Sequence, residues 1–171
     1  MRDSQNVFHL AIPCKDLDET YDFYVTKLGC KLARRYADRI TLDFFGDQVV
    51  CHLDPDRVEQ SPKMYPRHFG VTFREKVQYD NLLKLAHQRN VPFFQEPMTR
   101  FAGRVEEHLT FFLIDPANNL LEFKYYYDLR RDQEGVDQAG DTVWSERASC
   151  SLPHLFHLRS ANSPDRRVAD L

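Results

Sequence analysis

The sequence lacks any apolar run near the length of about 20 residues that a membrane-spanning helix requires. Its first residues, MRDSQNVFHLAIP, lack the apolar stretch of a secretory signal. Four cysteines are present, none in a C-x-x-C pair, which disfavours both a disulfide framework and a cysteine-based zinc site. We therefore expect a cytoplasmic protein with free thiols and no membrane partner. The cysteines are Cys14, Cys30, Cys51 and Cys150.

An excess of basic residues is also missing. The formal net charge is −3, so the composition gives no reason to expect a nucleic-acid partner. Hydrophobic residues make up 42% and charged residues 29% of the 171 positions, proportions typical of globular proteins. The chain is long enough for one domain with a substantial core but short for two ordinary domains.

What is present is a pattern of one strand, one helix and three strands that occurs twice, at about residues 6–54 and 67–127. A polar, proline-rich linker, residues 55–66, joins the copies. We expect the first helix to stop at Gly29 and the second copy's second strand to break at Pro97. The expected strands lie at about 6–12, 30–37, 39–45, 48–53, 67–73, 91–96, 106–114 and 120–127, and the helices at about 15–28 and 79–89.

One such module leaves a curved sheet with an uncovered face, which a second copy must close. The sequence therefore predicts a single α+β domain, residues 1–130, in which two βαβββ modules form a cup-shaped mixed β-sheet. Residues 131–171 are mostly polar, and we expect a poorly ordered tail. Its apolar piece, residues 152–158, either docks on the domain or a partner or has no role in the chemistry.

Three residues combine metal-ligand chemistry with matching positions in the repeat. His9 and His68 lie in the first strand of each module, and Glu122 lies in the last, apolar strand. A buried carboxylate needs a cation, and no lysine or arginine occupies the matching position of the other module. Two imidazoles and one carboxylate suit iron(II), manganese, nickel or zinc and leave positions open for substrate. In the alternative interpretation, the histidines bond to the backbone and Glu122 faces solvent.

Two further histidines are candidates for moving protons. Counting from the turns, Val50 matches Glu122, and His52 lies two residues further along on the same strand face. His52 is a fourth ligand, an acid or base at the rim, or a plain strand histidine. His108 begins a strand after two glutamates and is either a proton donor facing the substrate or a surface histidine.

Several motifs resemble those of the vicinal oxygen chelate superfamily, which includes glyoxalase I, epimerases, antibiotic resistance proteins and extradiol dioxygenases. The resemblance covers about residues 6–127. It implies two βαβββ modules around one metal, with ligands carried over to His9, His68 and Glu122. The motifs are FHLAI at 8–12, DLDETYDFYVTKLGC at 16–30, HFGV at 68–71 and FFLIDPANNLLEF at 111–123.

The resemblance leaves the reaction open. An iron(II) dioxygenase that cleaves catechol-like rings fits the ligand set, although Phe112 stands where ring-cleaving relatives carry a tyrosine. A glyoxalase I-like lyase or an epimerase needs a base beside the metal, a role that His52 would have to fill. A non-catalytic binder of small molecules, such as antibiotics, is a third alternative. Relatives of this length commonly form homodimers, which we also expect here.

Overall fold

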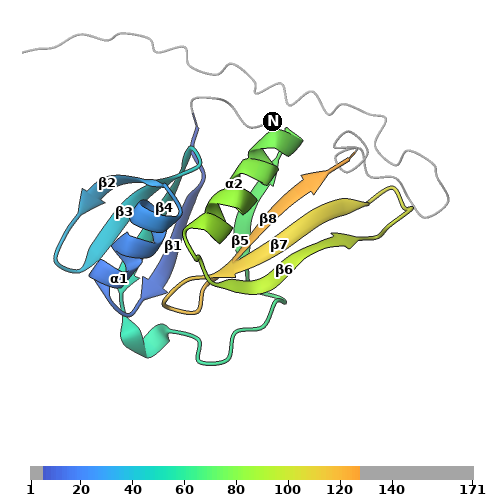
Figure 1. Cartoon of the computed structure of the whole chain (residues 1–171). Helices are drawn as coiled ribbons and strands as arrows, with labels where there is room; N and C mark the ends of the chain where they lie inside the picture. Colours follow the sequence, from blue (N-terminus) through green and yellow to red (C-terminus); the bar gives the residue numbers. More distant parts are fainter. Residues whose placement is uncertain (1–5, 128–171) are drawn as a thin grey trace, which may run out of the picture.

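The computed structural model describes residues 6–127, which form two four-stranded mixed sheets (Figure 1). The strand orders are β1-β4-β3-β2 and β5-β8-β7-β6, with β1 parallel to β4 and β5 parallel to β8. The predicted pair of βαβββ modules is therefore confirmed. The predicted tail, residues 131–171, lies outside the described residues. The strands are β1 His9–Cys14, β2 Lys31–Arg35, β3 Arg39–Phe44, β4 Asp47–Leu53, β5 Phe69–Phe73, β6 Phe93–Arg100, β7 His108–Ile114 and β8 Leu120–Tyr126.

The first helix begins where its sequence supplies a cap. The Asp16 carboxylate accepts hydrogen bonds from the backbone N–H groups of Asp18 and Glu19, which have no partner within the helix. Helix α1, Leu17–Tyr21, continues as the π-helical segment η1, Asp22–Lys27. The helical segment ends just before Gly29, whose φ of +85° is favourable for glycine, as predicted.

The second module departs from prediction mainly at two points, and its strands β5, β6 and β7 each begin two residues later than expected. Helix α2, Lys76–Gln88, begins three residues earlier than expected. Strand β6 runs through Pro97, so the predicted break is wrong. The reason is that β6 is an edge strand, and its pairing with β7 is irregular between Gln95 and Met98. Pro97 lies in this irregular stretch, so its missing N–H removes no hydrogen bond of a regular strand pair.

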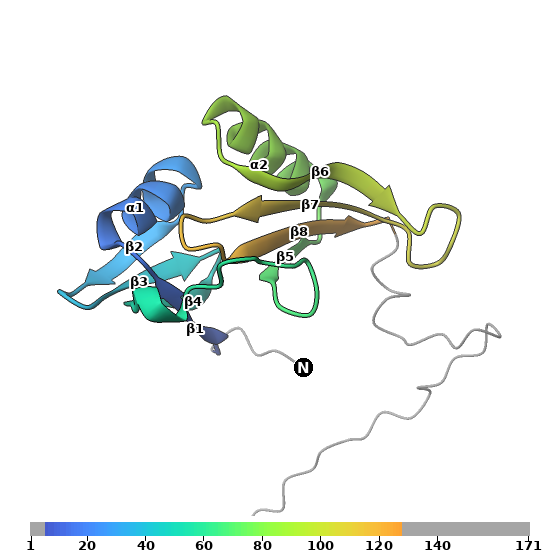
Figure 2. The ribbon, with the colours of Figure 1, turned by 90° about the horizontal axis from the view of Figure 1, so that it is seen from below.

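Both helices lie on the same side of the two sheets (Figure 2). Alternate strand residues on that side form one hydrophobic core that both modules share. Phe44 of the first module lies 5.5 Å from Phe69 and 6.3 Å from Phe123 of the second, measured between ring centroids. The modules are therefore joined through their helix-bearing faces. We call the opposite side of the two sheets the open face.

Hydrogen bonds around the turn after β7 also join the modules. The Tyr24 hydroxyl of η1 donates to the buried Asp115 carboxylate over 2.9 Å, and the Asn119 amide donates to the carbonyl of Pro13 in β1. Arg89 at the end of α2 donates to the carbonyl of Thr26. Burial raises the pKa of Asp115 above its ordinary value, although its hydrogen bonds oppose that shift.

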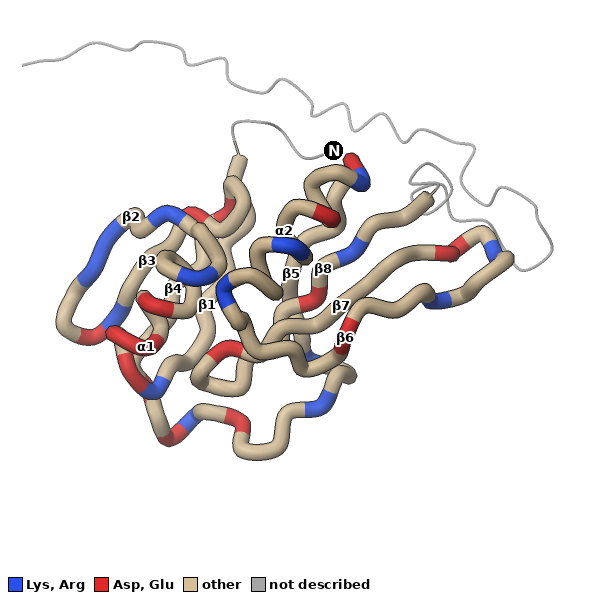
Figure 3. The backbone as a smooth tube through the Cα atoms, viewed as in Figure 1, with Lys and Arg blue, Asp and Glu red and all other residues tan. Residues whose placement is uncertain are grey.

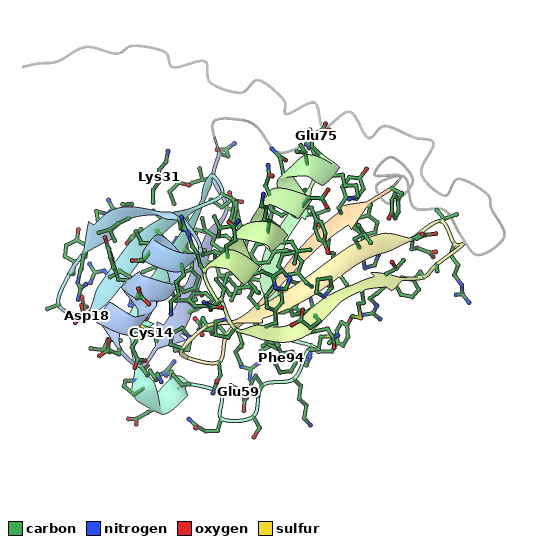
Figure 4. All side chains as sticks on the ribbon, viewed as in Figure 1. Cys14, Asp18, Lys31, Glu59, Glu75 and Phe94 are labelled. Atoms are coloured by element: carbon green, nitrogen blue, oxygen red, sulfur yellow. The ribbon has the colours of Figure 1, made fainter. Side chains whose placement is uncertain are left out.

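The linker also contacts the second module. Glu59 lies in this segment (Figure 4), where its carboxylate pairs with Arg67 and its carbonyl accepts a hydrogen bond from Asn118. The short 3-10 helix η2, Pro55–Arg57, begins the linker. Charged residues of both signs are spread over the described chain (Figure 3). Among residues 6–127, the helices are all too short to cross a membrane.

Candidate metal centre

The centre of the second sheet places one carboxylate on the open face. Glu122 of β8 lies opposite Gly70 of β5 and Phe112 of β7, and only 4% of its surface is exposed. Strand β5 passes so close that a Cβ at position 70 would lie 1.7 Å from the backbone oxygen of Glu122. Glycine in the HFGV motif is thus required by the close approach of the strands that carry His68 and Glu122.

His68 and Glu122 meet, as predicted. The Nδ1–H of His68 donates to the carbonyl of Met64 over 2.8 Å, which leaves Nε2 to face the carboxylate. Nε2 lies 2.9 Å from Oε2 of Glu122. An imidazole lone pair and a carboxylate repel unless a proton or a metal ion lies between them.

The spacing of these two atoms fits a metal site. Neighbouring ligands in an octahedral site lie about 3 Å apart when each bond is about 2.1 Å long. The observed 2.9 Å between His68 and Glu122 matches that spacing. A nitrogen and a carboxylate oxygen are also ligand types that divalent transition metals accept. The pair therefore fits two positions of such a site.

Glu122 has two further partners. The Thr110 hydroxyl donates to Oε1 over 3.0 Å, and the Lys124 ammonium lies 2.9 Å from Oε2. Lys124 was not predicted as a partner, because Glu122 had been compared only with the matching strand of the other module. The sequence did contain the signal. Lys124 follows Glu122 by two residues in the same strand, and because strand side chains alternate between faces, the two lie on the same face.

His9 is not brought to this pair within one chain. It is exposed at the start of β1, where its Nδ1–H donates to the side-chain oxygen of Gln48 over 2.6 Å. Among residues 6–127 no three His, Cys, Asp or Glu side chains come close enough to hold a metal ion. The physical reason is that the modules of one chain join through their helix-bearing faces, so their open faces do not close over each other.

His9 nevertheless has the same local arrangement as His68. In both rings, Nδ1 donates to an oxygen of the same module and Nε2 is left available. The register also matches, because Ala11 pairs with Val50 as Gly70 pairs with Glu122. Val50 is therefore the counterpart of Glu122, and it is apolar and buried.

The two histidines expected to move protons differ in exposure. His52 is exposed on the open face of β4, paired across the strands with Arg39 and Pro13. His108 is 4% exposed and its Nδ1–H donates to the carbonyl of Glu106, so its interpretation as a surface histidine is wrong. Its ring packs 4.5 Å from that of Tyr126.

Tyr65 and Arg100 lie beside the site and were missed from the sequence. The Tyr65 ring packs 5.6 Å from the imidazole of His68, and the Arg100 guanidinium donates to the Tyr65 hydroxyl. No sequence signal identified Tyr65, because it belongs to the linker. The ring centroids of Phe112 and His68 lie 5.4 Å apart. An apolar ring therefore stands beside His68 at the position where ring-cleaving relatives are expected to carry a tyrosine.

A separate hollow lies away from this pair, in the first module. Its volume is about 210 Å³ and it includes Lys31, which points outward from the start of β2 (Figure 4). No histidine lines it, so the hollow and the metal-ligand chemistry occupy different places. Its lining residues are Gly29, Cys30, Lys31, Asp43, Phe45 and Gly46.

Comparisons with known proteins agree with the fold. The model of the Glyoxalase/Bleomycin resistance protein/Dioxygenase superfamily matches residues 6–123. The glyoxalase domain-containing protein RDO1 of Mycosarcoma maydis is 30% identical over 71% of this chain and 69% of its own length. A crystal structure of a glyoxalase/bleomycin resistance protein/dioxygenase from Alicyclobacillus acidocaldarius is 69% identical, with a TM-score of 0.74, over 77% of this chain and 98% of that chain.

A more distant structure shows the same fold. The fosfomycin resistance protein FosX of Listeria monocytogenes has a TM-score of 0.57 at 14% identity, covering 74% of this chain and 96% of that chain. At this identity the likeness concerns the arrangement of strands and helices alone.

Proposed function

This chain belongs to the Glyoxalase/Bleomycin resistance protein/Dioxygenase superfamily, and from that premise we propose that it is a divalent-metal-dependent enzyme acting on a small oxygen-bearing substrate. The observation that carries the proposal is the convergence of His68 Nε2 and Glu122 Oε2 at 2.9 Å. The His68 ring is fixed by Met64, and the Glu122 carboxylate is fixed by Thr110. Such outer partners orient metal ligands.

We propose His9 as the third ligand, supplied by a second copy of the chain. His9 lies on the open face with Nε2 available, but it does not reach His68 and Glu122 of its own chain. A homodimer with two-fold symmetry would place the first module of each copy over the second module of the other, and so form two identical sites. Two exposed apolar residues just before β1, Val7 and Phe8, support burial in such an interface.

Ring cleavage of a catechol-like substrate by an iron(II) extradiol dioxygenase is the reaction that we favour. The apolar, buried Val50 at the position matching Glu122 leaves the site with three protein ligands. Bound iron(II) would supply a Lewis acid with open positions for both substrate oxygens and dioxygen. Phe112 would give the bound ring an apolar neighbour, while Tyr65 and Arg100 would supply hydrogen-bond donors at the rim.

A lyase or isomerase of the glyoxalase I kind is the second candidate, and the exposure of His52 favours it. This histidine lies on the open face two residues beyond Val50, with its ring free to meet a substrate carbon acid. An imidazole can serve as base near neutral pH, in place of the carboxylate that Val50 does not provide.

Metal analysis and oxygen uptake together test the proposal. Protein purified without chelators should contain close to one divalent ion per chain, and catechols should stimulate oxygen consumption by the iron(II)-loaded form. Nickel or zinc with turnover of a hemithioacetal and no oxygen uptake would favour the second candidate. A chain that takes up no divalent metal under any condition would refute both.

A further inference from the structure

Lys124 contacts the same oxygen of Glu122 that faces His68. Its Nζ and the Nε2 of His68 each lie 2.9 Å from the same oxygen, Oε2 of Glu122. The Lys124 side chain is 26% exposed, whereas Glu122 is only 4% exposed. The ammonium group therefore reaches a buried carboxylate from the accessible side of the site.

A lysine ammonium and a divalent metal cannot both bind this oxygen well. Both are cations, and at ligand distances from one oxygen they would repel each other strongly in a partly buried site. The four-carbon stem of lysine is flexible, so its charge can move away while the strand stays in place. Metal uptake should therefore displace Lys124 from Glu122.

The displaced ammonium stays on the open face beside the substrate positions. Lys124 of β8 pairs with Thr110 of β7. Two residues earlier in β7, His108 pairs with Arg100 of β6, so Arg100 lies on the same face as Lys124. In strands β5, β7 and β8, Glu122 is the one acidic residue. With Glu122 bound to metal, Lys124 is the one remaining Lys, Arg, Asp or Glu side chain of these three strands.

We propose that Lys124 holds Glu122 in place of the metal in the metal-free chain and, after metal uptake, contacts an anionic oxygen of the substrate. The inference rests on the proposed function and adds a substrate class, namely molecules that bind the metal through a carboxylate or other oxyanion. A lysine with a purely structural role would support the fold of the metal-free chain without competing with the metal.

Two titrations on Lys124→Gln test the inference. Glutamine keeps a hydrogen-bond donor near Glu122 but removes the charge, so the variant should fold. Calorimetry should show manganese(II) binding about tenfold more tightly to the variant than to the wild type. Oxalate, used as an anionic probe of the manganese-loaded protein, should bind the variant about tenfold more weakly.

The outcomes separate this inference from the proposed function. Unchanged or weaker manganese affinity in Lys124→Gln, or unchanged oxalate affinity, would overturn the role of Lys124 alone. A wild type that binds no manganese would overturn the proposed function and this inference with it. Lys124→Arg, which keeps the charge, and Lys84→Gln, on the exposed side of α2, should both behave as the wild type.

Discussion

Gly70 and Glu122 lie directly opposite each other in the parallel pair β5 and β8. The gap between them is so small that a Cβ on Gly70 would lie 1.7 Å from the Glu122 backbone oxygen. The strand that follows His68 is therefore held against the strand that carries Glu122 by the absence of a side chain. This close approach is a condition for the 2.9 Å separation of the two candidate ligands.

Gly70→Ala should destabilise the protein strongly. The added methyl collides with backbone atoms that cannot rotate away, so we expect a loss of about 3 kcal/mol or more in the free energy of unfolding. Urea denaturation measures it. Gly103→Ala is the control, since a Cβ there meets nothing within 4 Å and only its positive φ costs about 1 kcal/mol. Equal losses in both variants would contradict this account.

Glu122→Ala should remove metal binding, because it deletes one of the proposed ligands. Calorimetry with manganese(II) should show an affinity at least about a hundredfold weaker than that of the wild type, whereas Thr110→Val, which deletes only an outer partner, should weaken it by about tenfold. Both changes lie on β7 and β8, so circular dichroism checks that the fold is retained. Wild-type affinity in folded Glu122→Ala would refute the assignment.

Mixing two inactive variants tests whether the site lies between copies. His9→Ala and Glu122→Ala should each bind no metal alone. After joint refolding, random pairing gives mixed dimers in which one of two sites is intact, so bound metal should recover to about a quarter of the wild-type level. Elemental analysis of the purified dimers measures this recovery. If all three ligands came from one chain, mixing would restore nothing.

Asp115 gives a stability that depends on pH. Its pKa is raised by burial above the ordinary value of 3.8, so the folded chain holds this proton more tightly than the unfolded chain. Its contribution to the free energy of unfolding therefore falls as the pH rises from 3.8 through the raised pKa.

Asp115→Asn lacks that dependence. The amide nitrogen cannot accept from the Tyr24 hydroxyl, so the variant should be about 1–3 kcal/mol less stable near neutral pH. The wild type gains stability as Asp115 takes up its proton, and the variant does not. The difference in the free energy of unfolding between the two should therefore grow as the pH falls through the raised pKa of Asp115. Urea denaturation of the metal-free proteins over a pH series measures both profiles, and parallel profiles would contradict the raised pKa.

The fold was largely predictable because the repeat, the turns and the strand periodicity are local features of the sequence. Gly29 ends the first helical segment with a left-handed φ, as predicted, whereas the cap formed by Asp16 was not predicted. Pro97 misled because the effect of a proline on a strand depends on whether that strand lies at a sheet edge. Edge position is a property of the tertiary structure.

The site was predictable only in part, for a similar reason. His68 and Glu122 meet because parallel pairing of β5 with β8 follows from the module itself. The separation of His9 depends on which faces of the modules join, and no local pattern specifies that choice. Lys124 was overlooked although strand alternation alone places it beside Glu122.

Alternate strand positions face opposite sides of the sheets. One set forms the shared core, and the other set lies on the open face with the candidate metal centre. In evolutionary terms, substitutions at exposed open-face positions such as His52 can change the chemistry while the core residues between such positions preserve the packing against the helices. A duplicated module of this kind therefore offers natural selection a surface on which new reactions can be explored at little cost to folding.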